Sequence, residues 1–531
     1  MMGRKAFTPK VLDRFSLEER VPPDHLLRRV AQAVDFAFVR RLTARFYSRT
    51  GQPSVDPVVL FKMALLGYLY GIASERRLAE EIRLNLAYMW FLGYDLDETP
   101  PDHSVLSKAR RRFGPTVYQA FFTEVVRQCE RAGLVRGDKL YADSTLVEAD
   151  AGLDSVGSRA LVAQLPEVGA HVARLWRENP DPTADDGGSS TDPPPAPASA
   201  VVAPDVAAAD PPGAPAAPGP HPATAADRPN TAVGRVNGWV VSRTDPEAEL
   251  VSRSGVPLDL YYKVHVGVDA GRARIVTAVE VTGGAVADEH LLDRIVREHE
   301  GNTGRALAEV VADAKYGTGA NDAALEERGI AASIPMHENG AARRALPADA
   351  FAYDAPTDTY VCPTGGRLRR QGRSTTGGTN GGTIYRARPS ACAACAHKAV
   401  CCPTARARTM FRPDDGGLRD RTVADLRTFR ARQSIRRRTA WVETVCGDGK
   451  ERRGLRRARV RGRDGVRVQA LLTATAYNVR KLALRKTTRP GPGLGTAEKW
   501  TPPDRIDPVG VCRPPTIAPH ARRTRLRPGL N

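Results

Sequence analysis

A long segment near the middle of the chain limits how the rest of it can fold. Between Glu178 and Asp227 there are eight acidic residues but no Lys, Arg or aromatic residue, and Pro, Ala and Gly dominate. Such a segment cannot bury enough apolar surface to offset the entropy lost when its backbone is ordered. We therefore interpret residues 178–228 as a disordered linker. One folded domain is then expected to be assembled from the sequences on both sides of it.

The remainder of the 531-residue chain is strongly basic. Lys and Arg number 79 against 60 Asp and Glu, and the formal charge of +19 is already reduced by the acidic linker. A polyanion such as double-stranded DNA is the expected partner, and an anionic membrane surface is the weaker alternative. No apolar run reaches the roughly 18 residues of a transmembrane helix, and the N-terminal segment lacks the apolar core of a signal peptide. We therefore expect a cytoplasmic location.

Residues 1–135 have the pattern of a helical region. The stretch from Asp56 to Gly71 is apolar, with Pro57 placed at the first position of a helix. Leu78, Ile82 and Leu86 then recur every four residues, as they would on a helix with one buried face. The pattern predicts an all-helical N-terminal domain.

A basic run near the end of this region has two interpretations. Arg110, Arg111 and Arg112 follow Lys108 in a segment that is predicted to be helical. Such a run is commonly a solvated helix face, but in a helical DNA-binding domain it would contact phosphates. The positive charge of the chain favours the second interpretation, so we predict that Arg110, Arg111 and Arg112 contact DNA, with the solvated face as the alternative.

Short runs of β-branched and aromatic residues predict a mixed α/β core. One run covers residues 139–147, and three more lie within residues 231–284, after the linker. A helix is predicted over residues 287–296, then a strand within residues 306–317, then a helix over residues 321–328. This order suits a central sheet that carries an active site at the ends of its strands.

Three carboxylates are the candidate catalytic residues. Asp143 and Asp313 each follow a short apolar run that predicts a strand, and Glu443 lies in a basic stretch that predicts a helix. Hard divalent cations prefer oxygen ligands, and two of them can stabilise both the attacking and the leaving oxygen of a phosphodiester. The pattern therefore predicts a site for two Mg²⁺ or Mn²⁺ ions.

Cysteines are concentrated in residues 346–415, which are also rich in Gly, Thr and Arg. A CxxC pair with two further thiols can form a tetrahedral zinc site, and a metal of this kind would stabilise a segment that has little hydrophobic core. The alternative is that these are free or buried thiols. The predicted zinc ligands are Cys362, Cys392, Cys395 and Cys401 or its neighbour Cys402, with His397 in reserve.

Several sequence blocks occur together in one order: TPKVLDRFSLEERVPPDHLLRRV, SVDPVVLFKMALLGYLYG, YADSTLVEADA, YYKVHVGVD, VVADAKYG and WVETVCGDGK with NVRKL. In this order they closely resemble the bacterial insertion-sequence DDE transposases. The resemblance implies a ribonuclease-H-like core in which Asp143, Asp313 and Glu443 bind the metal ions. It also implies an enzyme that cuts and rejoins DNA at terminal inverted repeats, and at least a homodimer, because two ends must be brought together.

The predicted helix around Glu443 carries basic residues at regular spacing. Arg436 and Lys450 lie seven residues to either side of Glu443, so on an uninterrupted helix all three share one face. By the same resemblance, Lys450 matches a lysine of the family, and Arg438 lies beside the position of its arginine. We expect Arg436, Arg438 and Lys450 to contact DNA, together with the arginine-rich residues 451–467 that follow.

Lys263 and His265 alternate on one predicted strand and therefore share a face. If that face borders the active site, Lys263 would contact a DNA phosphate. For His265 we favour the simpler interpretation, a packed position inside the sheet.

The predicted organisation has seven parts. They are a helical DNA-binding domain (1–135), the start of the catalytic core (136–177), the linker (178–228), the continued core (229–345), a cysteine-bearing insertion (346–415), a helical end of the core with Glu443 (416–486) and a flexible tail (487–531). The leading functional prediction is a metal-dependent DNA transposase. The alternative is a zinc-stabilised DNA-binding protein that derives from a transposase and no longer catalyses.

Overall fold

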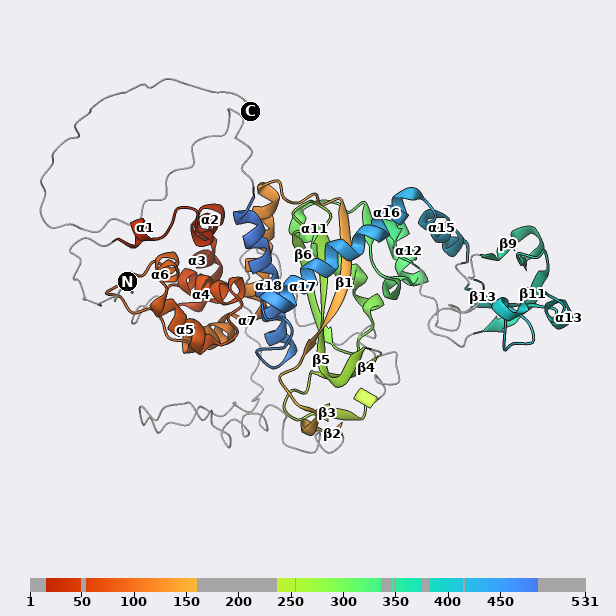
Figure 1. Ribbon diagram of the computed structural model, residues 1–531, viewed down its shortest axis with the longest axis horizontal. Coiled ribbons are helices and arrows are strands. Elements are labelled where there is room, and N and C mark those ends of the chain that lie inside the picture. Colours follow the sequence, from red (N-terminus) through yellow and green to blue (C-terminus); the bar gives the residue numbers. More distant parts are fainter. Residues whose placement is uncertain are drawn as a thin grey trace, which may run out of the picture. The chain divides into compact units, whose positions relative to one another are not determined.

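The computed structural model describes residues 16–48, 54–159, 236–253, 255–335, 346, 350–374, 382–413 and 416–485 (Figure 1). The predicted linker at 178–228 and the predicted tail at 487–531 lie outside these residues, as does the end of the first core segment. The described chain is a mixed α/β structure with a helical N-terminal region.

The N-terminal region is helical, as its apolar spacing predicts. Pro57 is the first residue of its helix, and the Asp56 side chain caps that helix by accepting from the Val58 amide. The long final helix bends at Gly114, whose φ of 66° lies in the left-handed region, immediately before Pro115. The helices are α1 (Leu17–Arg20), α2 (Leu26–Ala33), α3 (Phe38–Thr43), α4 (Pro57–Leu69), α5 (Glu75–Leu84), α6 (Leu86–Leu92) and α7 (Ser104–Arg131).

The central sheet is antiparallel on one side of β1 and parallel on the other. Its order is β6-β5-β1-β7-β8, and β4 pairs with the first half of β5. β5 runs antiparallel to β1 and β6, whereas β7 runs parallel to β1 and β8. The strands are β1 (Lys139–Glu148), β4 (Glu249–Arg253), β5 (Val256–Asp269), β6 (Val276–Gly283), β7 (Glu309–Val311) and β8 (Ala331–Ser333).

One hydrophobic core joins the N-terminal helices to this sheet. Helix α18 (Arg463–Ala483) packs against α2, α4 and α7 and also against β6. Its fully buried Asn478 donates to the Val276 carbonyl at 2.7 Å and accepts from the Val276 amide at 2.9 Å. The side-chain amide therefore satisfies backbone groups of the outer strand β6. Helix α11 (Leu292–Thr303) packs against β6 and α7.

The first strand predicted after the linker is shorter than its sequence indicates. Within the described part of residues 231–246, only β3 (Val240–Ser242) is a strand, and it pairs with β2 (Val156–Ser158) outside the central sheet. The neighbouring Trp239 is 75% exposed, so its aromatic ring does not belong to the core. The predicted helix at 287–296 begins as a single 3₁₀ turn, η4 (Asp288–Leu291), before α11.

The cysteine-rich residues form a small sheet of their own with the order β13-β12-β11-β10-β9, all antiparallel. Helices follow it, and the uninterrupted helical stretch from Phe429 to Arg452 passes across β1 (Figure 1). The elements are β9 (Ala352–Asp354), β10 (Thr359–Val361), β11 (Arg367–Ser374), β12 (Gly382–Ala387), α13 (Pro389–Ala393), α14 (Lys398–Cys401), β13 (Thr409–Pro413), α15 (Gly416–Leu426), α16 (Phe429–Arg438), a π-helical turn η9 (Thr439–Glu443) and α17 (Thr444–Arg452).

A buried acid between α11 and α7 makes the stability of this core depend on pH. Burial, and next the nearby charge of Glu280, raise the pKa of Glu298 to about 8, although Gln119 donates to it at 2.7 Å. Between the ordinary value of 4.5 and about 8, the folded protein therefore binds a proton that the unfolded chain has lost. This proton stabilises the fold below that range, and its contribution is lost as pH rises.

We expect Glu298→Gln to remove this pH dependence. Relative to the parent, the variant should gain about 2 kcal/mol of stability between pH 5.5 and pH 7.5, which thermal unfolding at both pH values would measure. An equal difference between the two proteins at both pH values would contradict the raised pKa.

Candidate active site

The pairing of parallel strands brings Asp143 and Asp313 to neighbouring positions. Tyr141 of β1 is the Cα partner of Val311 of β7, and the pairing of these strands ends there. Asp143 and Asp313 each come two residues later in the sequence. Their strands are neighbours, and paired strands lie about 4.8 Å apart. Asp313 follows the end of β7, as predicted, but β1 continues to Glu148. Asp143 therefore lies within its strand, at the point where β7 stops covering it.

The two carboxylates influence each other electrostatically. Burial raises the pKa of Asp143, and the negative charge of Asp313 adds to this, whereas Arg438 and the Ser144 amide oppose it. The Asp143 side chain is 17% exposed, and its Oδ2 accepts a hydrogen bond of 2.9 Å from Nη1 of Arg438. Asp313 accepts from the backbone amide of Lys315 and caps the turn after β7. Two acids arranged in this way favour a bound cation.

A third acid, Asp288, is linked to Asp313 through Lys315. It is 4% exposed and forms ion pairs with Lys263 at 3.3 Å and Lys315 at 3.6 Å, and Nδ1 of His265 lies 3.6 Å from its carboxylate. Burial opposes its ionisation, but Lys263 and His265 hold its pKa below the ordinary value. Lys315 lies 3.6 Å from Asp288 and 3.9 Å from Asp313, so the cluster helps to hold the turn that carries Asp313.

The structure agrees with the sequence prediction for His265 but not for Lys263. His265 is fully buried, and burial lowers its pKa to about 3, which agrees with the packed position that we favoured. Lys263 is also buried, and it donates to the Val286 carbonyl as well as pairing with Asp288. Its ammonium group is thus occupied inside the protein and is not presented to a DNA phosphate, in contrast to the prediction.

Glu443 lies on the helical stretch that crosses β1. It is exposed and ends the π-helical turn η9, while the preceding Trp441 packs against Tyr141 with 5.9 Å between ring centroids. Three residues on, burial and the charges of Asp143 and Glu443 together raise the pKa of the Cys446 thiol to about 12. Both acids are therefore near Cys446, one on the strand and one on the helix.

The π-helical turn changes the predicted relation between the basic residues and Glu443. A π turn holds more residues than an α turn, so Arg436, Glu443 and Lys450 do not repeat as they would on an uninterrupted α-helix. Arg436 is exposed and Lys450 is half-buried. Burial lowers the pKa of Lys450, although the nearby Cys446 acts to raise it. Arg438 instead contacts Asp143.

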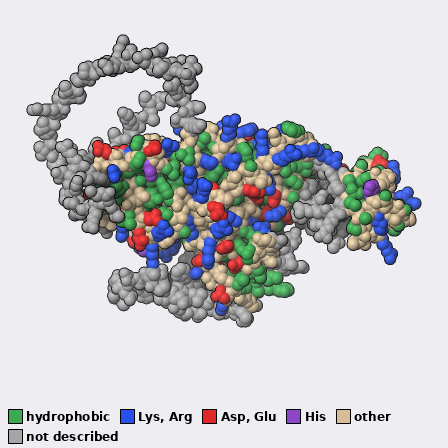
Figure 2. All heavy atoms as spheres, in the orientation of Figure 1, with side chains coloured by type: hydrophobic (Ala, Val, Ile, Leu, Met, Phe, Trp, Pro, Cys, Tyr) green, Lys and Arg blue, Asp and Glu red, His purple; other side chains and the backbone are tan. Residues whose placement is uncertain are grey.

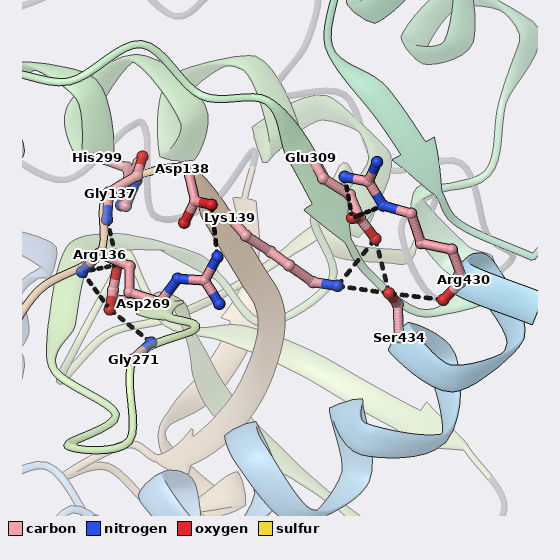
Figure 3. A network of polar contacts seen from close by, with 10 residues as sticks. All are labelled: Arg136, Gly137, Asp138, Lys139, Asp269, Gly271, His299, Glu309, Arg430 and Ser434. Carbon is pink, nitrogen blue, oxygen red and sulfur yellow. Dashed lines mark hydrogen bonds and ion pairs between the residues drawn. The ribbon is translucent and has the colours of Figure 1, made fainter.

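A buried polar network holds α16 against the sheet (Figure 3). Glu309 of β7 is 2% exposed and accepts from Lys139 of β1 at 3.0 Å, from Ser434 of α16 at 2.7 Å and from Arg430 of α16 at 2.9 Å. Arg438 lies one helical turn after Ser434. The network therefore fixes the part of α16 from which Arg438 reaches Asp143.

The basic residues predicted to bind DNA are not equally available. Figure 2 shows Lys and Arg side chains in a row over α16. In α7, Arg111 is exposed and Arg112 lies over the Tyr47 ring at 5.2 Å, but Arg110 is engaged by Glu75. The row on α16 and the exposed Arg111 fit a surface for phosphates better than Arg110 does.

Within the described residues, no three His, Cys, Asp or Glu side chains have their donor atoms gathered as a formed metal site. The donor chemistry of Asp143 and Asp313 nevertheless fits a hard cation, because both are carboxylates and one already attracts a guanidinium. Glu443, on the adjoining helix, is available as an exposed carboxylate.

No described helix is long and apolar enough to cross a membrane.

Two family models match the chain. One, described as a transposase domain (DUF772), matches residues 15–112, which include most of the N-terminal helices. The other, described as a transposase DDE domain, matches residues 361–483. Both matches support an insertion-sequence DDE transposase. The second match includes Glu443 and strands β11, β12 and β13 of the cysteine-rich sheet, but it begins after Asp143 and Asp313. No curated protein matches the chain.

Proposed function

We propose that this transposase cuts and joins the ends of an insertion sequence by two-metal phosphodiester transfer. Asp143, Asp313 and Glu443 are the proposed metal ligands. The observation that carries the proposal is the register of β1 and β7, which puts the two aspartates at neighbouring positions with interacting charges. The adjoining helix supplies the third carboxylate.

The strand order supports a ribonuclease-H-like core. Three antiparallel strands, β6, β5 and β1, are followed across the sheet by the parallel strands β7 and β8. In such a sheet the functional groups gather where adjacent strands diverge, as β1 and β7 do beside Asp143. The mixed order thus supports the same site as the family match.

Two Mg²⁺ or Mn²⁺ ions, when bound, would supply charge stabilisation for the attacking and the leaving oxygen. The chain itself positions the reacting strand. Asp288 and Lys315 hold the turn that carries Asp313, and Glu309 holds the helix that leads to Glu443. Arg438, which is 18% exposed beside Asp143, is placed to move to a DNA phosphate once a cation replaces it at the carboxylate.

The proposed substrate is double-stranded DNA, both as terminal inverted repeats and as target. Arg436 and the other arginines of α16, together with Lys450 and Arg111, are proposed to contact its phosphates. Joining two ends requires two active sites, so we propose a homodimer on DNA. Because its substrate is chromosomal DNA, we propose a cytoplasmic, nucleoid-associated location.

We expect the loss of Arg438 to strengthen metal binding in the absence of DNA. Its guanidinium competes for the Asp143 oxygen at 2.9 Å, so Arg438→Gln should raise the affinity for Mn²⁺ by about tenfold, equivalent to about 1.4 kcal/mol. Titration of Mn²⁺ followed by electron paramagnetic resonance would measure this. Arg437→Gln, on the exposed neighbour, is the control. Unchanged or weaker Mn²⁺ binding by Arg438→Gln would contradict the competition.

The direct test is cleavage of DNA that carries the ends of the element, with Mg²⁺ and with EDTA. We expect Mg²⁺-dependent strand cleavage at the ends and joining of the released 3′ ends to target DNA. Binding of the same DNA with no cleavage in Mg²⁺ or Mn²⁺ would instead favour the non-catalytic DNA-binding protein, which no present observation supports.

A further inference from the structure

Five cysteines from three separate segments line one cavity in the cysteine-rich sheet. Cys362 follows β10, Cys392 and Cys395 lie at the end of α13, and Cys401 and Cys402 lie at the end of α14. The cavity has a volume of about 240 Å³, and all five are free thiols. Thiols from three segments that line one cavity suggest a shared ligand.

The chain turns tightly around the sulfur of Cys362. The Cys362 amide donates to the Gly366 carbonyl at 2.8 Å, and the Gly365 amide donates to the Cys362 carbonyl at 2.8 Å. Gly365 has a φ of 81°, and a Cβ on Gly366 would lie 3.1 Å from the Cys362 sulfur. The two glycines let the backbone wrap closely around this thiol. Such a turn fixes the direction of a sulfur ligand.

The opposite wall of the cavity already brings thiols together. Burial, and next the nearby Cys392 side chain, raise the pKa of the Cys402 thiol, and Cys402 is 7% exposed. The CxxC spacing keeps Cys395 in the same turn as Cys392, because the Cys395 amide donates to the Cys392 carbonyl at 3.3 Å. Cys401 is less buried than Cys402, and like Cys362 it packs beside the hydrophobic core of this sheet. Cys392, Cys395 and Cys402 are therefore the members of this wall best placed to act together.

The charge around the cavity suits a metal bound by thiolates. Four thiolates and one Zn²⁺ carry a net charge of −2, which basic neighbours would stabilise. Arg408 donates to the Cys401 carbonyl at 3.1 Å, so one guanidinium is fixed at the cavity wall. The basic residues that line the cavity are Arg367, Arg369, Arg388, Lys398 and Arg408.

The small sheet also has little else to stabilise it. Its buried hydrophobic core consists of Phe351, Tyr360, Leu368, Tyr385 and Met410. A core of this size contributes little free energy of folding, and small structures of this kind commonly depend on a metal or on disulfides.

We propose that this cavity binds one structural Zn²⁺ through Cys362, Cys392, Cys395 and Cys402. Tetrahedral coordination at about 2.3 Å would bring the sulfurs of Cys362 and Cys395 towards those of Cys392 and Cys402. Of the two thiols that the sequence left open, Cys402 is the proposed ligand because it is the more buried and lies near Cys392. The site is independent of the proposed catalytic metals, because its ligands are thiols and it lies in a separate sheet.

Elemental analysis of the full-length protein, purified without added metal, tests the site. We expect about one zinc per chain, retained in Cys401→Ser and in the control Cys129→Ser but lost in Cys392→Ser and Cys402→Ser. Less than half a zinc per chain, or full zinc in Cys392→Ser, would overturn the proposal. Loss of zinc in Cys401→Ser with retention in Cys402→Ser would overturn the ligand assignment.

Cobalt substitution covers the case in which a cysteine variant does not fold, because it uses the unaltered protein. The Co²⁺ protein should show the absorption of tetrahedral cobalt with four thiolate ligands, and one equivalent of Zn²⁺ should abolish it. Absorption of octahedral cobalt alone, or a spectrum that Zn²⁺ leaves unchanged, would overturn the proposal even if every variant unfolds.

Discussion

Replacing Asp143 by Asn should reduce DNA cleavage and strand transfer by about a thousandfold or more. The substitution keeps the shape of the side chain but removes the charge that a divalent cation needs. A loss of this size corresponds to about 4 kcal/mol of transition-state stabilisation, which is reasonable for one ligand of a metal that stabilises a phosphodiester. Single-turnover cleavage of DNA carrying the element ends would measure the effect.

DNA binding by this variant should stay close to that of the parent, because the phosphate contacts come from other residues. Asp138→Asn is the matched control: the same substitution, near the start of the same strand, at an acid that pairs with Arg136 at 2.6 Å. We expect it to retain most of its activity. Undiminished joining by Asp143→Asn, or an equal loss in the control, would remove Asp143 from the catalytic set.

Glu309→Ala should destabilise the protein by about 3 kcal/mol. Glu309 is 2% exposed, and its removal leaves the Lys139 ammonium, 16% exposed, without its carboxylate partner. Removing one partner of a buried ion pair is much more damaging than removing one at the surface. The loss of contacts to Ser434 and Arg430 also frees α16 from the sheet, so activity should fall as well. Thermal unfolding would measure the loss of stability, and single-turnover cleavage of DNA carrying the element ends would measure the loss of activity.

A surface ion pair supplies the comparison. Glu130 pairs with Arg305 at 2.7 Å, where Arg305 is 52% exposed. Glu130→Ala should change stability by less than about 1 kcal/mol. If Glu309→Ala were no more harmful than Glu130→Ala, the network would not hold α16 as described.

Local patterns were sufficient to predict most of the elements. The apolar run at 139–147 and one of the runs of β-branched and aromatic residues within 231–284 correspond to β1 and β5, because both strands are buried between other elements over most of their length. Trp239 shows the limit of such patterns: its segment is rich in β-forming residues, yet the ring is exposed and β3 pairs only with β2. The strand propensity of a segment does not indicate which other strand it will pair with.

The site depended on features that the sequence does not encode locally. No β7 residue pairs with Asp143, because the pairing of β1 with β7 ends two residues before it. Contacts between segments that are distant in the sequence set this register. The spacing of Arg436, Glu443 and Lys450 assumed an unbroken α-helix, which the π turn at Thr439–Glu443 interrupts.

Buried charges were the least predictable part of the site. Lys263 and Glu309 have side chains that are usually exposed, and only their partners in the fold explain why they are buried. Alternation along the strand correctly put Lys263 and His265 on one face, but it did not indicate that the face is covered by Asp288.

Iron-induced cleavage of the polypeptide would test most directly whether the three carboxylates share one metal centre. Fe²⁺ replaces Mg²⁺ in the DNA-bound transposase, and ascorbate with peroxide then generates radicals that cut the backbone close to the metal. We predict cuts near Asp143, Asp313 and Glu443, competed by excess Mg²⁺ and all lost together in Asp143→Asn. Cuts near the two aspartates with none near Glu443, or cuts that persist in Asp143→Asn, would contradict the shared centre.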